Sequence, residues 1–224
     1  MAQSLAEKNN LIRAAVMGAN DGILSVSGIV IGVAGATIDS FAIFIAGFAG
    51  ALAGTVSMAM GEYVSVHSQN DAQIRAEQEQ AQALKTHYDD EVNFVIKKYE
   101  GLGIDHQLAT QATHEMMADN ALETSVRERH GFTLHHEVSA FGAATASMIA
   151  FPLGSILPMV TIVNLAPKIR IIGTGLAVLV ALAITGYIAA QFSGVNRYKG
   201  TLRNVMAGLF TMMITFFIGK LMGR

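Results

Sequence analysis

The sequence predicts an all-α membrane protein with five transmembrane helices and a three-helix insert between the second and third. Of its 224 residues, 52% are hydrophobic and 14% are charged, whereas a soluble domain carries about 25% charged residues. Five apolar runs are long enough for a helix to cross a bilayer, and they lie at 12–37, 41–65, 138–164, 169–192 and 203–222. The polar residues gather between the second and third runs.

Composition divides the chain into three segments. Residues 66–136 hold 12 of the 17 acidic residues and all seven histidines, whereas 138–224 contain no Asp or Glu. We therefore expect membrane helices one and two in residues 1–65, an acidic helical metal-binding domain in 66–136, and helices three to five in 137–224. Lys and Arg near the helix ends favour a cytoplasmic N-terminus and insert and an outside C-terminus.

Turn and cap signals predict the helices of the insert. The second membrane helix should continue through 66–86, which lack Gly and Pro. The next helix should begin at the Asp89-Asp90 cap and stop at Gly101, and the third should run from Asp105 to Gly131. Three short helices bury a small core, so we expect this domain to need a second copy or bound metal.

Asp21 is the only ionisable group between residues 14 and 38. A charge at the centre of a membrane helix costs roughly 2.5–3.5 kcal/mol on insertion scales, and such residues usually serve a function. Asp21 shares a helix face with small residues such as Gly18 and Ser25, which favours contact with protein or water over lipid. A structural, hydrogen-bonded carboxylate is the alternative. A carboxylate can hold a proton or a cation in turn, and we favour an ion or proton site.

The second membrane helix adds Met58, Met60 and Glu62. A thioether suits late, borderline metals better than Ca²⁺ or Mg²⁺, so Asp21 and a methionine on one pathway would favour a transition metal. Taken alone, these methionines are better explained by packing, and Glu62 by the cytoplasmic end of the helix. In the third membrane helix, Pro152 and Pro158 predict a bend or a break.

The insert contains further candidate metal ligands. Met116 falls on the apolar stripe of its helix and is expected in the core, whereas Met117 falls off the stripe and is expected to be exposed. His135 and His136 are adjacent and so do not face the same way on a helix, which makes them interfacial residues rather than a metal pair. Most acidic side chains would otherwise be solvated surface; the candidates are Glu77, Glu79, Asp89, Asp90, Glu91, Glu115, Met116, Met117 and Glu123.

The motifs GANDGILSVSGIVIGVAGA, SMAMGEYVSVHSQND and MMADNALE…RERHGF resemble those of the vacuolar iron transporter family, and the layout of five spans with an insert is similar over the whole chain. The resemblance implies a homodimer with a pore between the chains, lined by the first helix. It implies export of ferrous iron, and often manganese, from the cytoplasm in exchange for protons. Asp21 and Met58 would be the intramembrane metal ligands, and Glu62 would lie at the cytoplasmic mouth.

The resemblance also implies paired E-x-x-E motifs and a Met-Met step in the cytoplasmic domain. Met116 and Met117 are retained, but each pair has lost one carboxylate: the pairs are Glu77 with Gln80, Glu91 with Phe94, and Asn120 with Glu123. We therefore expect weaker metal binding there, with Glu79, Glu115 or His114 as replacements, and manganese as a rival to iron.

The sequence thus predicts a proton-coupled metal exporter in a bacterial cell membrane, or a vacuolar membrane in a eukaryote. A membrane-anchored metal sensor that transports nothing is the alternative. An enzyme is not expected, because no histidine lies in any span to complete a Ser-His-Asp arrangement. No resident cofactor or nucleic-acid partner is expected: the metal ion is the cargo, and the partners are a second copy, protons and lipid.

Overall fold

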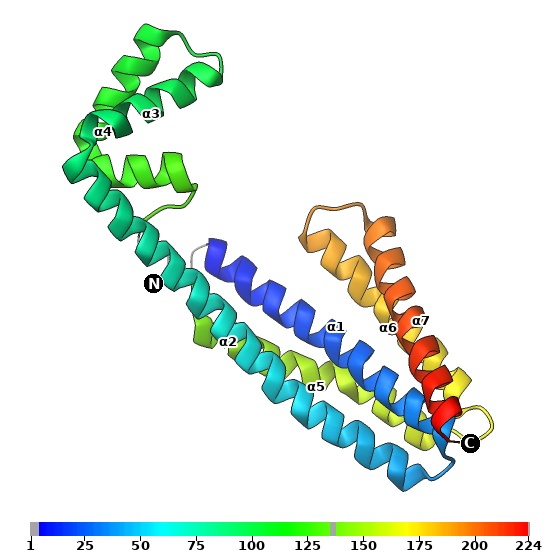
Figure 1. Cartoon of the computed structure of the whole chain (residues 1–224). Helices are drawn as coiled ribbons and strands as arrows, with labels where there is room; N and C mark the ends of the chain where they lie inside the picture. The colour runs from blue at the N-terminus through cyan, green and yellow to red at the C-terminus, as the bar shows by residue number, and fades with distance from the viewer. Residues whose placement is uncertain (1–4, 135–137, 224) are drawn as a thin grey trace. The chain divides into compact units, whose positions relative to one another are not determined.

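The computed structural model describes residues 5–134 and 138–223, and every regular element in these ranges is a helix (Figure 1). The helices are α1 (Leu5–Ala36), α2 (Ser40–Thr86), α3 (Tyr88–Gly101), α4 (His106–His130), α5 (Ala140–Asn164), α6 (Arg170–Phe192) and α7 (Arg197–Met222). Of these, α1, α2, α5, α6 and α7 are long and apolar enough to cross a membrane. The predicted all-α class and the five spans are confirmed.

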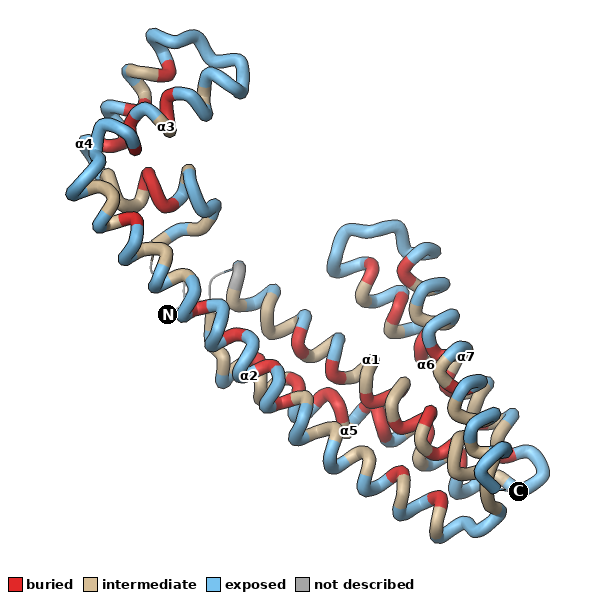
Figure 2. Tube along the Cα trace, in the orientation of Figure 1, coloured by how far each residue is buried: buried red, intermediate tan, exposed pale blue. Residues whose placement is uncertain are grey.

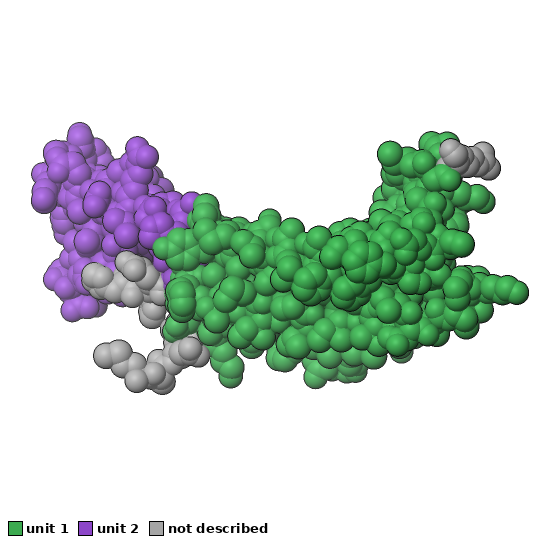
Figure 3. All heavy atoms as spheres, turned by 90° about the horizontal axis from the view of Figure 1, so that it is seen from below, with its two compact units in different colours: residues 1–65, 139–224 green, residues 66–138 purple. Residues whose placement is uncertain are grey.

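The chain forms two compact units, coloured separately in Figure 3. The first unit, called the membrane unit here, comprises residues 1–65 and 139–224, and the second, called the insert, comprises 66–138. The single helix α2 runs from one unit into the other. His135 and His136 lie outside the described residues.

Helix α1 is the centre of the membrane unit, because it packs along α5 and also contacts α6 and α7 (Figure 1). Glycines allow close approach: a Cβ on Gly22 would overlap the carbonyl oxygen of Phe151, and one on Gly154 would overlap that of Ala19. The buried core lies between these helices (Figure 2) and includes Val26, Val30, Phe151, Val178 and Leu182. Small residues thus replace apolar bulk where helix backbones meet, as expected inside a bilayer.

Helix α2 is the least enclosed of the first three spans. The most apolar window of α2 is 11% buried, compared with 44% for α1. Large side chains such as Phe41, Leu52 and Val56 are exposed along it. This apolar part of α2 therefore presents most of its surface to lipid or to another chain.

Helix α5 continues without interruption through Pro152 and Pro158, so of the predicted bend or break, the break is wrong and the bend stays a prediction. Arg170, the first residue of α6, is buried, with 3% of its surface exposed. Its guanidinium donates to the carbonyl oxygen of Ile38 at 3.1 Å and to Ser40 Oγ at 3.3 Å. This contact ties the turn between α1 and α2 to the start of α6.

In the insert, α3 and α4 pack through Val92, Ile96, Ala109 and Met117. Helix α3 begins at an His87 cap, two residues before the predicted Asp89-Asp90 cap. Its predicted end at Gly101 is confirmed, as are both ends of the third helix. There Asp105 Oδ1 accepts from the Gln107 amide at 2.9 Å, and Gly131 closes the helix in the left-handed region at φ 78°.

Helix α4 has a break that the sequence analysis did not predict. Asn120 leaves the helical region, with φ −150° and ψ 91°.

The two ends of the insert are joined by hydrogen bonds between Asn70 of α2 and the backbone of Val138. Asn70 Nδ2 donates to the carbonyl oxygen of Val138 at 2.9 Å, and Asn70 Oδ1 accepts from the Val138 amide at 3.3 Å.

Candidate functional site

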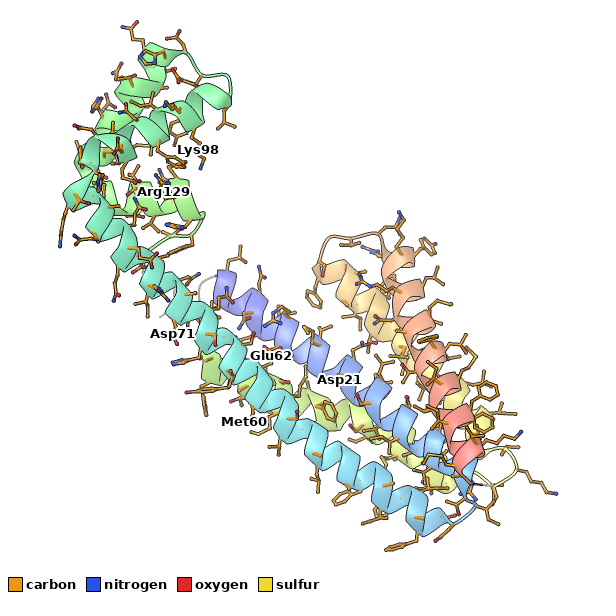
Figure 4. The ribbon with its side chains drawn as sticks, viewed as in Figure 1. Asp21, Met60, Glu62, Asp71, Lys98 and Arg129 are labelled. Carbon is orange, nitrogen blue, oxygen red and sulfur yellow. The ribbon has the colours of Figure 1, made fainter. Side chains whose placement is uncertain are left out.

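The orientation of α1 is fixed by the residues on either side of Asp21. Asn20 Oδ1 accepts hydrogen bonds from Asn204 Nδ2 of α7 at 2.9 Å and from Thr185 Oγ1 of α6 at 3.3 Å. Gly22 lies against the backbone of α5 at Phe151. With two sides of the helix engaged in this way, Asp21 faces the remaining side, toward α2 (Figure 4).

An open cleft of about 640 Å³ lies between α1 and α2 in the membrane unit. Apart from apolar and glycine positions, its lining offers two carboxylates, two thioethers, three hydroxyls and one guanidinium: Asp21, Glu62, Met17, Met58, Ser25, Ser57, Ser65 and Arg13. Oxygen and sulfur donors from both helices therefore face one space, and this combination suits a divalent transition metal.

Asp21 is half-buried in the cleft. Ser25 Oγ, one turn further along α1, donates to Asp21 Oδ1 at 2.6 Å. This short hydrogen bond orients the carboxylate, and such bonds to a charged group are stronger than bonds between neutral groups.

Met58 and Glu62 lie one turn apart on α2 and both line the cleft. Met58 also packs against the core of the membrane unit. Met60 points to the other side of α2 (Figure 4) and is 56% exposed, so it does not join this site. The structure thus brings Asp21, Met58 and Glu62, predicted separately, to one cleft.

Glu62 does not stand alone. Although it is 6% exposed, its carboxylate contacts the guanidinium of Arg13, with Nη2 to Oε2 at 2.9 Å and Nη1 to Oε1 at 3.4 Å. Arg13 is one of the basic residues near the helix ends that favoured a cytoplasmic N-terminus, and its place in this site was not predicted from the sequence. A signal was present, because Arg13, Met17, Asp21 and Ser25 follow one another at four-residue steps and so share one helix face.

The predicted ligands of the insert are differently placed. Glu77 is half-buried, and Glu79 pairs with Arg75 at 3.1 Å on the exposed surface. Glu91 is buried, where it accepts from Gln80 Nε2 at 2.6 Å and from Arg129. The partners of Glu91 are therefore an amide and a guanidinium.

The two methionines exchange their predicted roles. Met117, expected at the surface, is 3% exposed and belongs to the core. Met116, expected in the core, is half-buried, and its sulfur lies 3.5 Å from Arg127 Nη2 and 3.9 Å from Tyr99 Oη. The stripe that packs on α3 runs one residue later than predicted.

Asn120 and Glu123 form a helix cap. Asn120 Oδ1 accepts from the Glu123 amide at 3.0 Å, and Glu123 Oε2 accepts from Asn120 Nδ2 at 3.1 Å. This reciprocal bonding resembles a capping box, and it starts the second half of α4 after the break. A structural role therefore accounts for the spacing that had suggested a ligand pair.

Glu128, which was not predicted from the sequence, connects α3 and α4. Its carboxylate accepts from Lys98 Nζ at 2.9 Å, Arg127 Nε at 3.0 Å and Tyr99 Oη at 2.9 Å. Burial alone would raise the pKa of the Glu128 carboxyl, but these hydrogen bonds outweigh it and lower the pKa below its usual value. Burial, and after it the hydrogen bond to Glu128, raises the pKa of the Tyr99 hydroxyl.

Within residues 5–134 and 138–223, no three His, Asp or Glu side chains come together in a way that could hold a metal ion. The predicted ligands of the insert are thus not assembled into a cluster. His114 is exposed, and Glu115 accepts from Gln111 Nε2 at 3.0 Å.

Five membrane-spanning helices with a polar, two-carboxylate cleft define an integral membrane protein, and such a cleft is typical of ion transporters. The sequence model of the VIT family matches residues 12–220, and the chain belongs to this family, as its motifs predicted. It is 32% identical to a vacuolar iron transporter of Acanthamoeba castellanii, over 94% of this chain and 78% of that protein.

Plant relatives show similar agreement. The chain is 30% identical to vacuolar iron transporter homolog 2 of Arabidopsis thaliana, over 97% of this chain and 87% of that protein. It is 29% identical to VIT-like transporter 1b of Glycine max, over 95% of this chain and 76% of that protein. These relatives support metal transport as the class of function.

Proposed function

We propose that this chain exports divalent transition-metal ions, Fe²⁺ foremost and Mn²⁺ next, from the cytoplasm in exchange for protons. The observation that carries the proposal is the cleft between two membrane-spanning helices that Asp21, Met58 and Glu62 all line. The name of the amoeba relative, a vacuolar iron transporter, supports iron as the first choice of cargo.

The chemistry of the cleft favours a borderline metal. Asp21 supplies a carboxylate oxygen oriented by Ser25, and Met58 supplies a thioether. Carboxylates alone would also suit Mg²⁺ and Ca²⁺, whereas a thioether ligand favours later metals. The ion would pass Glu62, lose water to these donors, and bind as Asp21 gives up its proton.

Proton coupling is supported by the membrane potential. Moving a divalent cation outward against an inside-negative potential costs about 4.6 kcal/mol per 100 mV, since each charge contributes about 2.3 kcal/mol. Export therefore needs a driving ion, and inward proton movement supplies one. The carboxylate of Asp21 can bind the two cations alternately.

We further propose that the working form is a homodimer with the pore between the chains, and with the N-terminus and the insert on the cytoplasmic side. In support, the cleft is open and α2 exposes most of its apolar window. Ser57, Gly61 and Ser65 are exposed small residues along the same cleft, which would let a second copy approach closely.

The test is reconstitution of the full chain into vesicles that contain a pH dye, with Fe²⁺, Mn²⁺, Co²⁺ and Zn²⁺ supplied in turn. Wild-type protein should move Fe²⁺ and Mn²⁺ with opposite proton flow, and Asp21→Asn should abolish both movements. Asp39→Asn is the matched control, because Asp39 is an exposed cap that accepts from the Phe41 amide at 2.9 Å. Full flux in Asp21→Asn would overturn the ligand role, and metal binding without flux in wild type would favour a sensor.

A further inference from the structure

At one end of the cleft the carboxylate of Glu62 already holds a cation, the guanidinium of Arg13. The Arg13 side chain is 47% exposed and that of Glu62 is 7% exposed. Both carboxylate oxygens are engaged, at 2.9 and 3.4 Å. An ion that binds Glu62 must therefore compete with Arg13 for the same oxygens.

The guanidinium cannot be removed by titration, because an arginine side chain stays protonated in proteins and has no acceptor atom. Only a stronger cation, or a better partner for the guanidinium, can separate the two side chains. We propose that Arg13 is a built-in competitor which divalent ions displace from Glu62 when they enter the cleft, and that it thereby selects against monovalent ions. This inference builds on the transport function proposed above.

The Arg13 guanidinium has neighbours other than Glu62 that could hold it after a metal ion displaces it. Its Nη2 also contacts Asn10 Oδ1 at 3.0 Å and its Nη1 contacts Met17 Sδ at 3.2 Å. Asn10 and Met17 lie one turn before and one turn after it on α1. When Glu62 is taken by a metal ion, the guanidinium can keep its bond to Asn10, whereas Met17, which lines the cleft, becomes available as a second thioether.

Charge explains why the competition would be selective. Coulomb attraction scales with the product of the charges, so a divalent ion at the same distance attracts a carboxylate twice as strongly as a guanidinium does. A monovalent ion has no such advantage, and it lacks the two directional hydrogen bonds that Arg13 makes. Arg13 also weakens the binding of the divalent ion, which favours its onward movement to Asp21.

The experiment measures Mn²⁺ binding to the full chain in detergent by electron paramagnetic resonance, and Mn²⁺ flux in vesicles. In Arg13→Gln we expect the Kd for Mn²⁺ to fall by about tenfold, since a charge-assisted competitor is lost. Na⁺ should compete with Mn²⁺ in this variant and not in wild type. In flux, KM should fall without a rise in maximal rate. An unchanged or higher Kd would overturn the proposal.

Three further variants make the result specific. Arg13→Lys keeps the charge but loses the two-pronged contact with Glu62, so its Kd should lie between those of Arg13→Gln and wild type. Arg203→Gln removes an exposed charge of α7 and should leave binding unchanged. In a Glu62→Gln background, Arg13→Gln should give no gain; a gain there would show that Arg13 acts elsewhere. If wild type shows no flux, the transport proposal fails, while the binding measurements still decide the role of Arg13.

Discussion

Arg129 of α4 holds both oxygens of Glu91 of α3 in a two-pronged ion pair, with Nε to Oε2 at 3.1 Å and Nη2 to Oε1 at 3.0 Å. The same guanidinium stacks on the Phe94 ring at 3.8 Å from its centroid. The positions where the family resemblance implied a carboxylate pair, Glu91 and Phe94, thus both contact one arginine. The carboxylate of Glu91 is therefore paired with an internal cation.

Loss of this cation should destabilise the insert. The Glu91 side chain is 9% exposed, so Arg129→Gln would leave a buried carboxylate without its counter-charge. We expect a loss of about 2–3 kcal/mol, below the 3–5 kcal/mol of fully buried pairs because Arg129 is partly solvated. Hydrogen exchange of α3 and α4 amides in the full-length protein would measure it.

Arg75→Gln is the matched control for Arg129→Gln. It removes an arginine that pairs with Glu79, but both side chains are largely exposed, and exposed pairs contribute about 0–1 kcal/mol. Equal effects of the two substitutions would contradict a structural role for the Arg129 pair. A chelator should not change the exchange of wild-type α3 and α4, whereas accelerated exchange on metal removal would show that metal holds the insert.

Asn120 offers a second way to separate capping from metal binding. Asn120→Ala removes the cap of the second half of α4 and should cost about 1 kcal/mol. Asn120→Asp keeps a capping oxygen, so its stability should remain near that of wild type, even though it restores a carboxylate next to Glu123. Thermal unfolding followed by circular dichroism, with and without Mn²⁺, distinguishes the roles: equal loss in both variants would argue against the cap.

Glu128 should give the insert part of its pH dependence. Its folded pKa is lowered from an ordinary value of 4.5, so the unfolded chain binds this proton more readily than the folded chain. The stabilisation is fully present above the unfolded pKa and is lost as pH falls through the lower folded pKa. Glu128→Gln should cost about 1–2 kcal/mol at neutral pH and nothing below the folded pKa.

The measurement is chemical unfolding of both proteins at neutral pH and in acid. The two unfolding free energies should differ at neutral pH and converge in acid. A difference that persists unchanged in acid would mean that Glu128 acts through packing rather than through charge.

The transmembrane spans were predictable because each is an apolar run of sufficient length, and the ends of α4 were predictable because Asp105 and Gly131 are strong local end signals. The packing face of α4 was not. Leu108, a large apolar residue near the start of α4, is 60% exposed, whereas Ala109, Thr113 and Met117 are buried. Small and polar residues at a buried stripe give a weak hydrophobic signal, and the break at Asn120 further disrupts the period.

The cleft was predictable only in part. Asp21 is conspicuous as a lone charge in an apolar run, and the residues one turn away share its face. The pairing of Arg13 with Glu62, by contrast, joins residues on different helices. It depends on how α1 is rotated, which Asn20 and Gly22 determine through contacts with α5, α6 and α7. Such long-range contacts cannot be derived from helical spacing.

The close approach of α1 and α5 leads to a last prediction. A Cβ at position 22 would overlap the carbonyl oxygen of Phe151, a backbone atom that cannot rotate away. Gly22→Ala should therefore separate the two helices or turn α1, at a cost of about 1–3 kcal/mol. Because Asp21 is the adjacent residue, the same shift should disturb its hydrogen bond with Ser25 and reduce metal flux even where the protein still folds.

Gly175→Ala is the control for this substitution. Gly175 lies within α6, and a Cβ there would meet nothing within 4 Å. This replacement should leave flux unchanged and raise stability slightly, since alanine favours a helix over glycine by about 1 kcal/mol. Thermal unfolding in detergent and Mn²⁺ flux in vesicles test both variants. If Gly22→Ala matched Gly175→Ala in both measurements, the contact with Phe151 would not be what positions Asp21 in the cleft.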